Sequence, residues 1–276
     1  MGIAPEPNAI PMPIYCPVTV RSLSTEEFRT LSYDLMSDVF KVRNELGRFF
    51  DERIYKLALA RRRADVALEV PVEISFHSFT KRYFLDVLTA SGGVFEFKAT
   101  ESLTRRHQAQ LLNQLFLLNL RHGLLVNLRP VNVTKEFVNA TLTADERRNI
   151  PVSDGDWVNS TPGAKSLRET LHLLIQEWGI GLELSLYEDA LTHFLGGAPT
   201  VIRRISVYFN GQAIAEQPLR MAHDRVAFKL TALESENELH LFVCHARRLI
   251  AHTGIQALLW VNLARRDITN TTLSPA

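Results

Sequence analysis

The 276-residue sequence has little cysteine, no long apolar run and almost no net charge. Its two cysteines, Cys16 and Cys244, are far apart, which argues against disulfide bonding, structural zinc and a cysteine-held iron–sulfur cluster. No run of eighteen apolar residues is present, so we expect no membrane span. The 31 Lys and Arg residues balance 30 Asp and Glu residues. Overall charge therefore neither favours nor excludes a polyanionic partner, and only local patches can do so.

The N-terminus is the next place where a common signal is missing. Residues 1–20 form a proline-rich extension without the basic start and continuous apolar run of a signal peptide. The sequence thus predicts a soluble, cytoplasmic protein without a membrane partner. With 46% hydrophobic residues, the chain can bury one large core or two modest ones, and its length favours two.

Residues 21–134 have the pattern of a mixed α/β domain. A capping box formed by Ser24 and Glu27 begins the first helix, and Gly47 is a natural end for it. The apolar periods predict helices over residues 24–46, 51–62 and 104–119 and strands over 68–76, 83–88, 94–98 and 124–128. The last strand follows a helical crossover, so we expect it to run parallel to the strand before it.

The second half repeats this order after a predicted linker over residues 135–165. Ser166 and Glu169 have the spacing of a second capping box, and the segment "VAFKLT" matches "FEFKAT". Matching landmarks lie 132, 131 and 135 residues apart, from Gly47 to Gly179, Lys98 to Lys229 and Asn127 to Asn262. We interpret the chain as a tandem duplication, with a second domain over residues 166–276.

The duplication offers a control for charged residues in apolar strands. Aligned without gaps through the central hairpin, Asp86 corresponds to Gln217, Glu96 to Ala227, Lys98 to Lys229 and, on the preceding helix, Glu52 to Leu184. The second copy has lost all three acids. Because an unpaired buried carboxylate is costly and a fold does not need it, function explains these acids better than folding does.

The retained residues suit one kind of chemistry. Glu96 and Lys98 are two apart on one strand, so they share a face, and Asp86 lies on the hairpin partner. Carboxylates gathered there suit a hard cation such as Mg²⁺ or Mn²⁺. The lysine would orient a water nucleophile or offset charge on a pentavalent phosphorus. This set is typical of phosphodiester hydrolysis.

These residues also resemble a known family. The pattern Asp86 followed by Glu96-Phe97-Lys98 resembles the PD-(D/E)XK nuclease superfamily, and "NELGRFFDERIYKLAL", "HQAQLLNQL" and "HGLLVNL" resemble its bacterial GxxExxY subfamily. The resemblance covers roughly residues 39–128. It implies a restriction-endonuclease-like α/β fold, duplicated here as a pseudo-dimer, with a magnesium-dependent nuclease site in the first copy. The implied roles are metal ligands Glu52, Asp86 and Glu96, catalytic lysine Lys98 and a polar helix residue, Gln110.

Three positions depart from the subfamily pattern. A second glycine is replaced by Phe49, a proline before the aspartate by Leu85, and an aromatic residue four after Gln110 by Gln114. The metal ligands are unaffected. The sequence also predicts nucleic-acid contacts at Arg105, Arg106, Lys81 and Arg82.

Each assignment has a structural alternative. Asp86 and Glu96 could form an ion-pair network with Lys98, Glu52 could be a solvated helix residue, and the arginines could be ordinary surface. The whole protein could instead be a non-catalytic nucleic-acid-binding or regulatory protein, or an interaction scaffold. The expected partner is nucleic acid, with DNA favoured, and the expected assembly is intramolecular domain pairing, with a higher oligomer left open.

Overall fold

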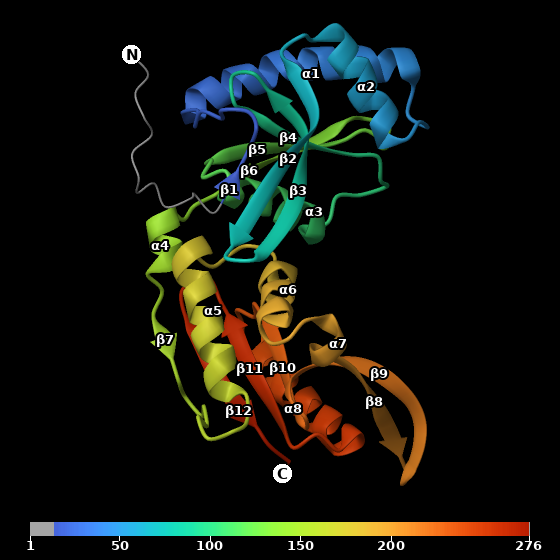
Figure 1. Ribbon diagram of the computed structural model, residues 1–276. Coiled ribbons are helices and arrows are strands. Elements are labelled where there is room, and N and C mark those ends of the chain that lie inside the picture. The colour runs from blue at the N-terminus through green and yellow to red at the C-terminus, as the bar shows by residue number, and fades with distance from the viewer. Residues whose placement is uncertain (1–13, 276) are drawn as a thin grey trace, which may run out of the picture. The chain divides into compact units, whose positions relative to one another are not determined.

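The computed structural model describes residues 14–275 of the chain. They divide into two compact units, 1–143 and 144–276, and each unit contains a six-stranded mixed sheet with helices (Figure 1). Most of the predicted N-terminal extension lies outside the described residues, but Ile14–Tyr15 form a short strand, β1, that pairs with β2. Within residues 14–275, no helix is both long and apolar enough to cross a membrane.

The first unit follows the predicted element order. Its helices are α1 (Thr25–Leu46), α2 (Glu52–Arg62) and α3 (Arg105–Leu117), and its remaining strands are β2 (Val66–Phe76), β3 (Phe79–Thr89), β4 (Val94–Lys98), β5 (His122–Asn127) and β6 (Thr134–Asn139). The capping box at Ser24 and Glu27 is present, and Gly47 ends α1 with a positive φ of 75°. These boundaries agree with the helix signals in the sequence.

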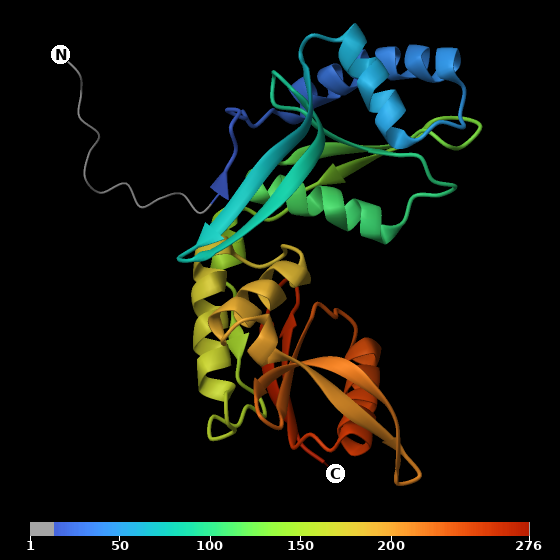
Figure 2. The same cartoon turned by 45° about the vertical axis from the view of Figure 1, so that its right-hand side comes forward.

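The first sheet has the order β1-β2-β3-β4-β5-β6, and β4 and β5 are its parallel pair. Helices α1 and α2 cover one face and α3 covers the other (Figure 2). The apolar face of α1, including Leu35, Met36 and Val39, is almost fully buried against Phe95 and Phe97 of β4. The central strand that carries Glu96 and Lys98 is thereby fixed from both sides.

The second unit has a similar succession of helices and strands, with one short helix added before its first hairpin. Its main elements are α5 (Ala164–Trp178), α6 (Leu184–Phe194), α7 (Ala198–Val201), β8 (Ile202–Phe209), β9 (Gln212–His223), β10 (Val226–Thr231), α8 (Glu236–Thr253), β11 (Ala257–Leu263) and β12 (Ile268–Leu273). The sheet order is β7-β12-β11-β10-β9-β8, with β10 and β11 parallel. The pairing from β8 to β12 therefore repeats the pairing from β2 to β6.

Two local predictions are wrong. The segment predicted as a linker over 135–165 holds most of β6, which pairs with β5, then α4 (Ala144–Arg148) and β7 (Val152–Ser153). Its polar residues reflect an edge strand and short surface elements, because an edge strand exposes much of its side-chain surface. Helix α5 begins after Gly163, so Ser166 and Glu169 lie inside the helix and form no capping box.

Candidate active site

The site begins where the hairpin of β3 and β4 separates. The two strands pair at Val87 with Phe95 and at Leu88 with Val94. Beyond these pairs, the Asp86 carboxylate accepts a hydrogen bond of 3.0 Å from the Phe97 backbone N–H. The Asp86 carboxylate thus satisfies a buried backbone donor that the strand pairing leaves unpaired. The other carboxylate oxygen of Asp86 stays available to neighbouring side chains.

Glu96 and Lys98 lie on β4 beside this opening. The Glu96 side chain is fully buried, and its carboxylate accepts hydrogen bonds from the Lys98 ammonium and from Nε2 of Gln114, the latter at 2.8 Å. Gln114 lies on α3 and also donates to the Phe84 carbonyl oxygen at 3.3 Å. Helix α3 therefore fixes the orientation of the Glu96 carboxylate.

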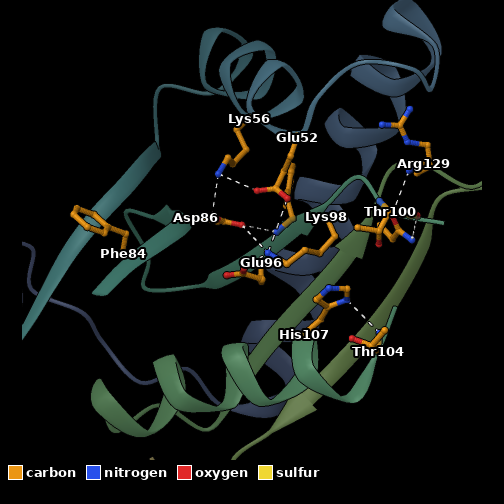
Figure 3. Close-up of polar contacts among 12 residues, drawn as sticks. Glu52, Lys56, Phe84, Asp86, Glu96, Lys98, Thr100, Thr104, His107 and Arg129 are labelled. Carbon is orange, nitrogen blue, oxygen red and sulfur yellow. Dashed lines mark hydrogen bonds and ion pairs between the residues drawn. The ribbon is translucent and has the colours of Figure 1, made fainter. Parts of the chain in front are cut away.

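Glu52 reaches the same place from the first turn of α2. The helix is tied to the preceding loop by Tyr55, whose hydroxyl donates to the Gly47 carbonyl oxygen at 2.8 Å. From there, a Glu52 carboxylate oxygen lies 3.9 Å from the Lys98 Nζ, and an Asp86 oxygen also lies 3.9 Å from that nitrogen. Figure 3 shows these side chains converging from three elements. The four residues predicted as metal ligands and catalytic lysine are thus brought together.

The electrostatics of the cluster are set by burial and by repulsion among the acids. Burial, and then the neighbouring Asp86 charge, raise the pKa of Glu96 to about 7 and also raise the pKa of Glu52. Burial alone would lower the pKa of Lys98, but the carboxylates around it, Glu96 foremost, outweigh burial and raise it. Lys98 is therefore a firmly charged ammonium among acids that repel one another.

Three residues of the cluster, Lys56, Glu69 and Gln114, were not predicted from the sequence. Lys56 lies one turn after Glu52 on α2, and its nearly buried ammonium contacts Glu52, Glu69 and Asp86. The spacing of Glu52 and Lys56, four residues apart on a helix, was the available signal. Gln114 contacts Glu96 as described above, and it does so in the role that the sequence assigned to Gln110, one helical turn earlier.

The four predicted nucleic-acid contacts lie on β3 and at the start of α3. Arg105 and Arg106 are exposed at the start of α3. Lys81 lies on β3 with its Nζ 5.6 Å from the centre of the Tyr83 ring, and Arg82 pairs with Glu73 at 3.0 Å. Asp86 lies five positions after Lys81 on β3, which is roughly 17 Å of chain. In contrast, the first turn of α3 is close enough to the cluster that burial, and then the Lys98 charge, lower the pKa of His107.

The second unit allows a structural check of the gapless alignment. In the first unit Val87 pairs with Phe95, but Val226, the gapless counterpart of Phe95, pairs with His223 and not with Pro218. His223 lies five residues after Pro218, so the two hairpins are paired in different registers, and the second also has a one-residue shift between Val226 and Ala227. The predicted correspondences of Asp86 with Gln217 and of Glu96 with Ala227 are therefore wrong.

An asparagine in each unit fixes the true register. The Asn127 side chain bonds both the N–H and the carbonyl of Thr100, and the Asn262 side chain does the same to Leu233. Thr100 thus corresponds to Leu233, 133 positions later. The same offset places Lys229 where Glu96 lies and Thr231 where Lys98 lies, which corrects the predicted match of Lys98 with Lys229.

Helix α6 differs from α2 in charge at the matching position. Tyr187 donates to the Gly179 carbonyl oxygen as Tyr55 does to that of Gly47, so Glu188 takes the place of Lys56. The Glu188 carboxylate lies 3.1 Å from Arg220 and 3.5 Å from Lys229. In the second unit one acid is therefore held between two cations at this place.

The donor chemistry of the first unit fits a hard divalent cation. Its acids offer carboxylate oxygens, which Mg²⁺ and Mn²⁺ prefer, and the buried Oε1 of Gln114 has no hydrogen-bond partner among the described residues. In residues 14–275, however, no three His, Cys, Asp or Glu side chains are grouped closely enough to hold a metal by themselves. The ammonium groups of Lys56 and Lys98 lie among the carboxylates.

Comparison with known proteins locates the resemblance in the first unit. Residues 29–140 match the model of the PD-(D/E)XK nuclease superfamily, a range that contains all of Glu52, Asp86, Glu96 and Lys98. Among solved structures, the chain is similar to one described as "Crystal structure of SSO0001", at 22% identity and a TM-score of 0.27. That match covers 43% of this chain and spans 62% of the other. No curated protein matches the sequence.

Proposed function

We propose that the first unit is a divalent-cation-dependent nuclease that hydrolyses phosphodiester bonds in nucleic acid, with DNA as the expected substrate. The observation that carries the proposal is the convergence of Glu52 and Asp86 on the Lys98 ammonium, at 3.9 Å each, beside the buried Glu96. These residues lie inside the range that matches the nuclease superfamily. Two carboxylates and a lysine at an opened hairpin are suited to phosphodiester hydrolysis.

The roles of the side chains follow from their positions. Asp86 and Glu96, with Glu52, are the residues that would hold the cation. When bound, such a cation supplies Lewis acidity and a more acidic water molecule. The Lys98 ammonium lies within reach of all three acids and would offset negative charge on the phosphoryl oxygens as it develops. Gln114 keeps the Glu96 carboxylate in a fixed orientation from α3.

The repulsion among the acids also supports cation binding. Burial and the nearby Asp86 charge raise the pKa of Glu96 to about 7, so near neutral pH part of the protein carries a proton there. A cation among these carboxylates would favour their charged forms and displace that proton. We therefore expect metal binding to release protons at neutral pH.

The test is a cleavage panel on the full chain. Labelled single- and double-stranded DNA and RNA are incubated with the protein in Mg²⁺, in Mn²⁺ and in chelator, and each reaction is repeated with Asp86→Asn. We expect metal-dependent cleavage by the native chain and loss of cleavage in the variant. Cleavage that persists in Asp86→Asn, or that needs no metal, would contradict the proposed site.

One observation favours a second candidate, a nucleic-acid-binding or regulatory protein with the same fold and no turnover. Two lysines lie among the carboxylates, and within the described residues no three acids form a ready metal group. Such a protein would bind DNA or RNA in the panel without cleaving either in any metal. The same experiment therefore distinguishes the two candidates.

We infer that the second unit is a degenerate copy of the first that arose by tandem duplication. The repeated order of strands and the shared Tyr–Gly and Asn contacts support this inference. Because Leu184 stands at the place of Glu52 and Lys229 at the place of Glu96, the second unit lacks two of the acids that would hold the cation in the first unit. We assign it a supporting role, as an intramolecular partner of the nuclease unit.

A further inference from the structure

Lys56 is the residue of the cluster whose role the nuclease proposal leaves open. Its side chain is only 7% exposed, and its ammonium contacts three carboxylates, with Asp86 at 2.9 Å and Glu52 at 3.2 Å and Glu69 as the third. A buried lysine carries a large desolvation cost, which these contacts offset. The pKa of Lys56 is raised although burial opposes this, because its carboxylate neighbours, Glu69 first, outweigh burial.

The backbone around Lys56 is arranged to bring these acids to it. Glu69 lies on β2 and has a positive φ of 50°, a conformation that costs energy for a residue with a side chain. The β2–β3 ladder pairs Leu68 with Val87 and Val70 with Leu85, so Glu69 stands across from Asp86. The strained residue thus places its carboxylate beside the same ammonium that Asp86 contacts.

Asp86 is consequently shared between two cationic neighbours. One of its oxygens, Oδ1, accepts from Lys56, whereas Oδ2 faces the Phe97 N–H and the Lys98 side. Glu69 lies on the Lys56 side of the cluster and Glu96 on the other side. Glu52 reaches both sides, with Oε1 3.2 Å from Lys56 and Oε2 3.9 Å from Lys98. A bridging aspartate with an acid on either side is the arrangement that a pair of divalent cations would require. Here one side is already taken by an ammonium.

The formal charges of the cluster also indicate that it binds a single divalent cation. Four carboxylates, those of Glu52, Glu69, Asp86 and Glu96, face the two ammonium groups of Lys56 and Lys98. The formal balance is two negative charges, which a single divalent cation neutralises. A second such ion would leave an excess of two positive charges beside the buried Lys56 ammonium, which is unfavourable, whereas without that ammonium the excess falls to one and its place is open.

We propose that the Lys56 ammonium occupies the place of a second divalent cation, so that the cluster binds one ion, on the Glu96 side of Asp86. Lys56 is a positioning residue in this account, since it acts through Asp86 and not on the substrate. The inference rests on the proposed cation site but not on cleavage.

The test counts ions bound by the full chain, with Mn²⁺ alone as the probe and no nucleic acid present. Isothermal titration calorimetry and the loss of the free Mn²⁺ spin-resonance signal give the number bound per chain. We expect one ion for the native protein and two for Lys56→Met, which keeps the length of the side chain and removes its charge. Lys41→Met is the matched control, because Lys41 pairs with Asp38 on α1 away from the cluster, and it should bind one ion.

A native chain that binds two ions or none would overturn the inference, and so would a Lys56→Met chain that binds one. If Lys56→Met does not fold, as judged by circular dichroism, Glu69→Gln serves instead, because the Glu69 side chain is 55% exposed and its loss opens no cavity. We expect Glu69→Gln to keep one ion with less than a threefold change in Mn²⁺ affinity. A loss of more than tenfold would place the ion on the Lys56 side and overturn the inference.

These measurements separate the inference from the nuclease proposal. If ion counts change as expected but the cleavage panel is blank, the nuclease function fails and the inference about Lys56 stands. If cleavage is metal-dependent but Lys56→Met binds one ion, the inference fails and the nuclease function stands.

Discussion

The two units share their internal contacts but differ in charge at the matching place. In both, a tyrosine hydroxyl donates to the glycine carbonyl eight residues earlier, and an asparagine side chain clamps the backbone after the central strand. In contrast, Lys56 becomes Glu188 and Glu96 becomes Lys229. The contacts that are common to both units hold the fold, and the acids of the first unit are additions that the fold does not need. This difference is the reason to assign them a function.

The largest expected effect is on cleavage. Variants of the first unit should lose cleavage and variants of the second unit should keep it. Lys98→Met should lower kcat by about 10²- to 10³-fold, because it removes a preorganised charge at the reacting phosphoryl group. Lys229→Met should leave kcat nearly unchanged, since Lys229 pairs with Glu188 in the second unit. Single-turnover cleavage assays measure both. Equal losses in the two variants would mean that the second unit takes part in the chemistry.

Metal-dependent stability should differ between the units in the same way. At about 100 times its Kd, a bound cation stabilises the folded state by roughly 3 kcal/mol, so Mg²⁺ or Mn²⁺ should raise the Tm of the native chain. Asp86→Asn should abolish this rise, because it removes the shared carboxylate. Glu188→Gln in the second unit should preserve it. Thermal scans with and without metal test the pair, and an undiminished rise in Asp86→Asn would remove Asp86 from the cation site.

The tyrosines should contribute similarly to stability in both units, because their hydroxyls make the same contact with a glycine carbonyl in each. Tyr55→Phe and Tyr187→Phe each remove a fully buried hydroxyl that donates to a glycine carbonyl, and Tyr55→Phe also removes the acceptor of the Phe50 backbone N–H. Each should lower the free energy of unfolding by about 1 kcal/mol. Urea denaturation measures this cost. A cost in one unit alone would show that the shared contact is not equivalent.

The last expected effect is a pH dependence of stability that arises in the first unit. The folded-state pKa of Glu96 is raised to about 7 from 4.5, so the folded chain holds a proton that the unfolded chain has released between these values. The contribution of Glu96 to stability is therefore fully present below about pH 4.5 and is lost as pH rises towards 7. In chelator, Glu96→Gln should flatten this decline. The exposed Glu101→Gln is the control and should retain the native slope, and an unchanged slope in Glu96→Gln would count against the buried-acid account.

Much of the fold could be predicted because local chemistry decides it. The capping box at Ser24, the stop at Gly47 and the alternation over residues 68–76 each specify structure without distant partners. The parallel pairing of β4 with β5 followed from the helix between them. The convergence of Asp86, Glu96 and Lys98 followed from the period of a strand and a hairpin.

The missed features depend on contacts that no local pattern encodes. Strand β6 is half polar because it lies at a sheet edge. For this reason the sequence pattern predicted a linker there. The register in which β9 pairs with β10 differs from that of β3 with β4 and includes a bulge, and a gapless alignment cannot detect either. From the sequence, Lys56 has the pattern of an ordinary helix residue, because its burial depends on Glu69 and Asp86, which lie on two strands.

The pairing of β4 has a consequence for the newly made chain. This strand meets β3 at two residue pairs and β5 at five, from Val94 with Gly123 to Lys98 with Asn127. A nascent chain that has left the ribosome only as far as α3 therefore contains every acid and lysine of the site but not the strand that holds Glu96 and Lys98 in place. Because Lys98 pairs with Asn127, the pairing of β4 with β5 can be complete only after synthesis has passed that residue.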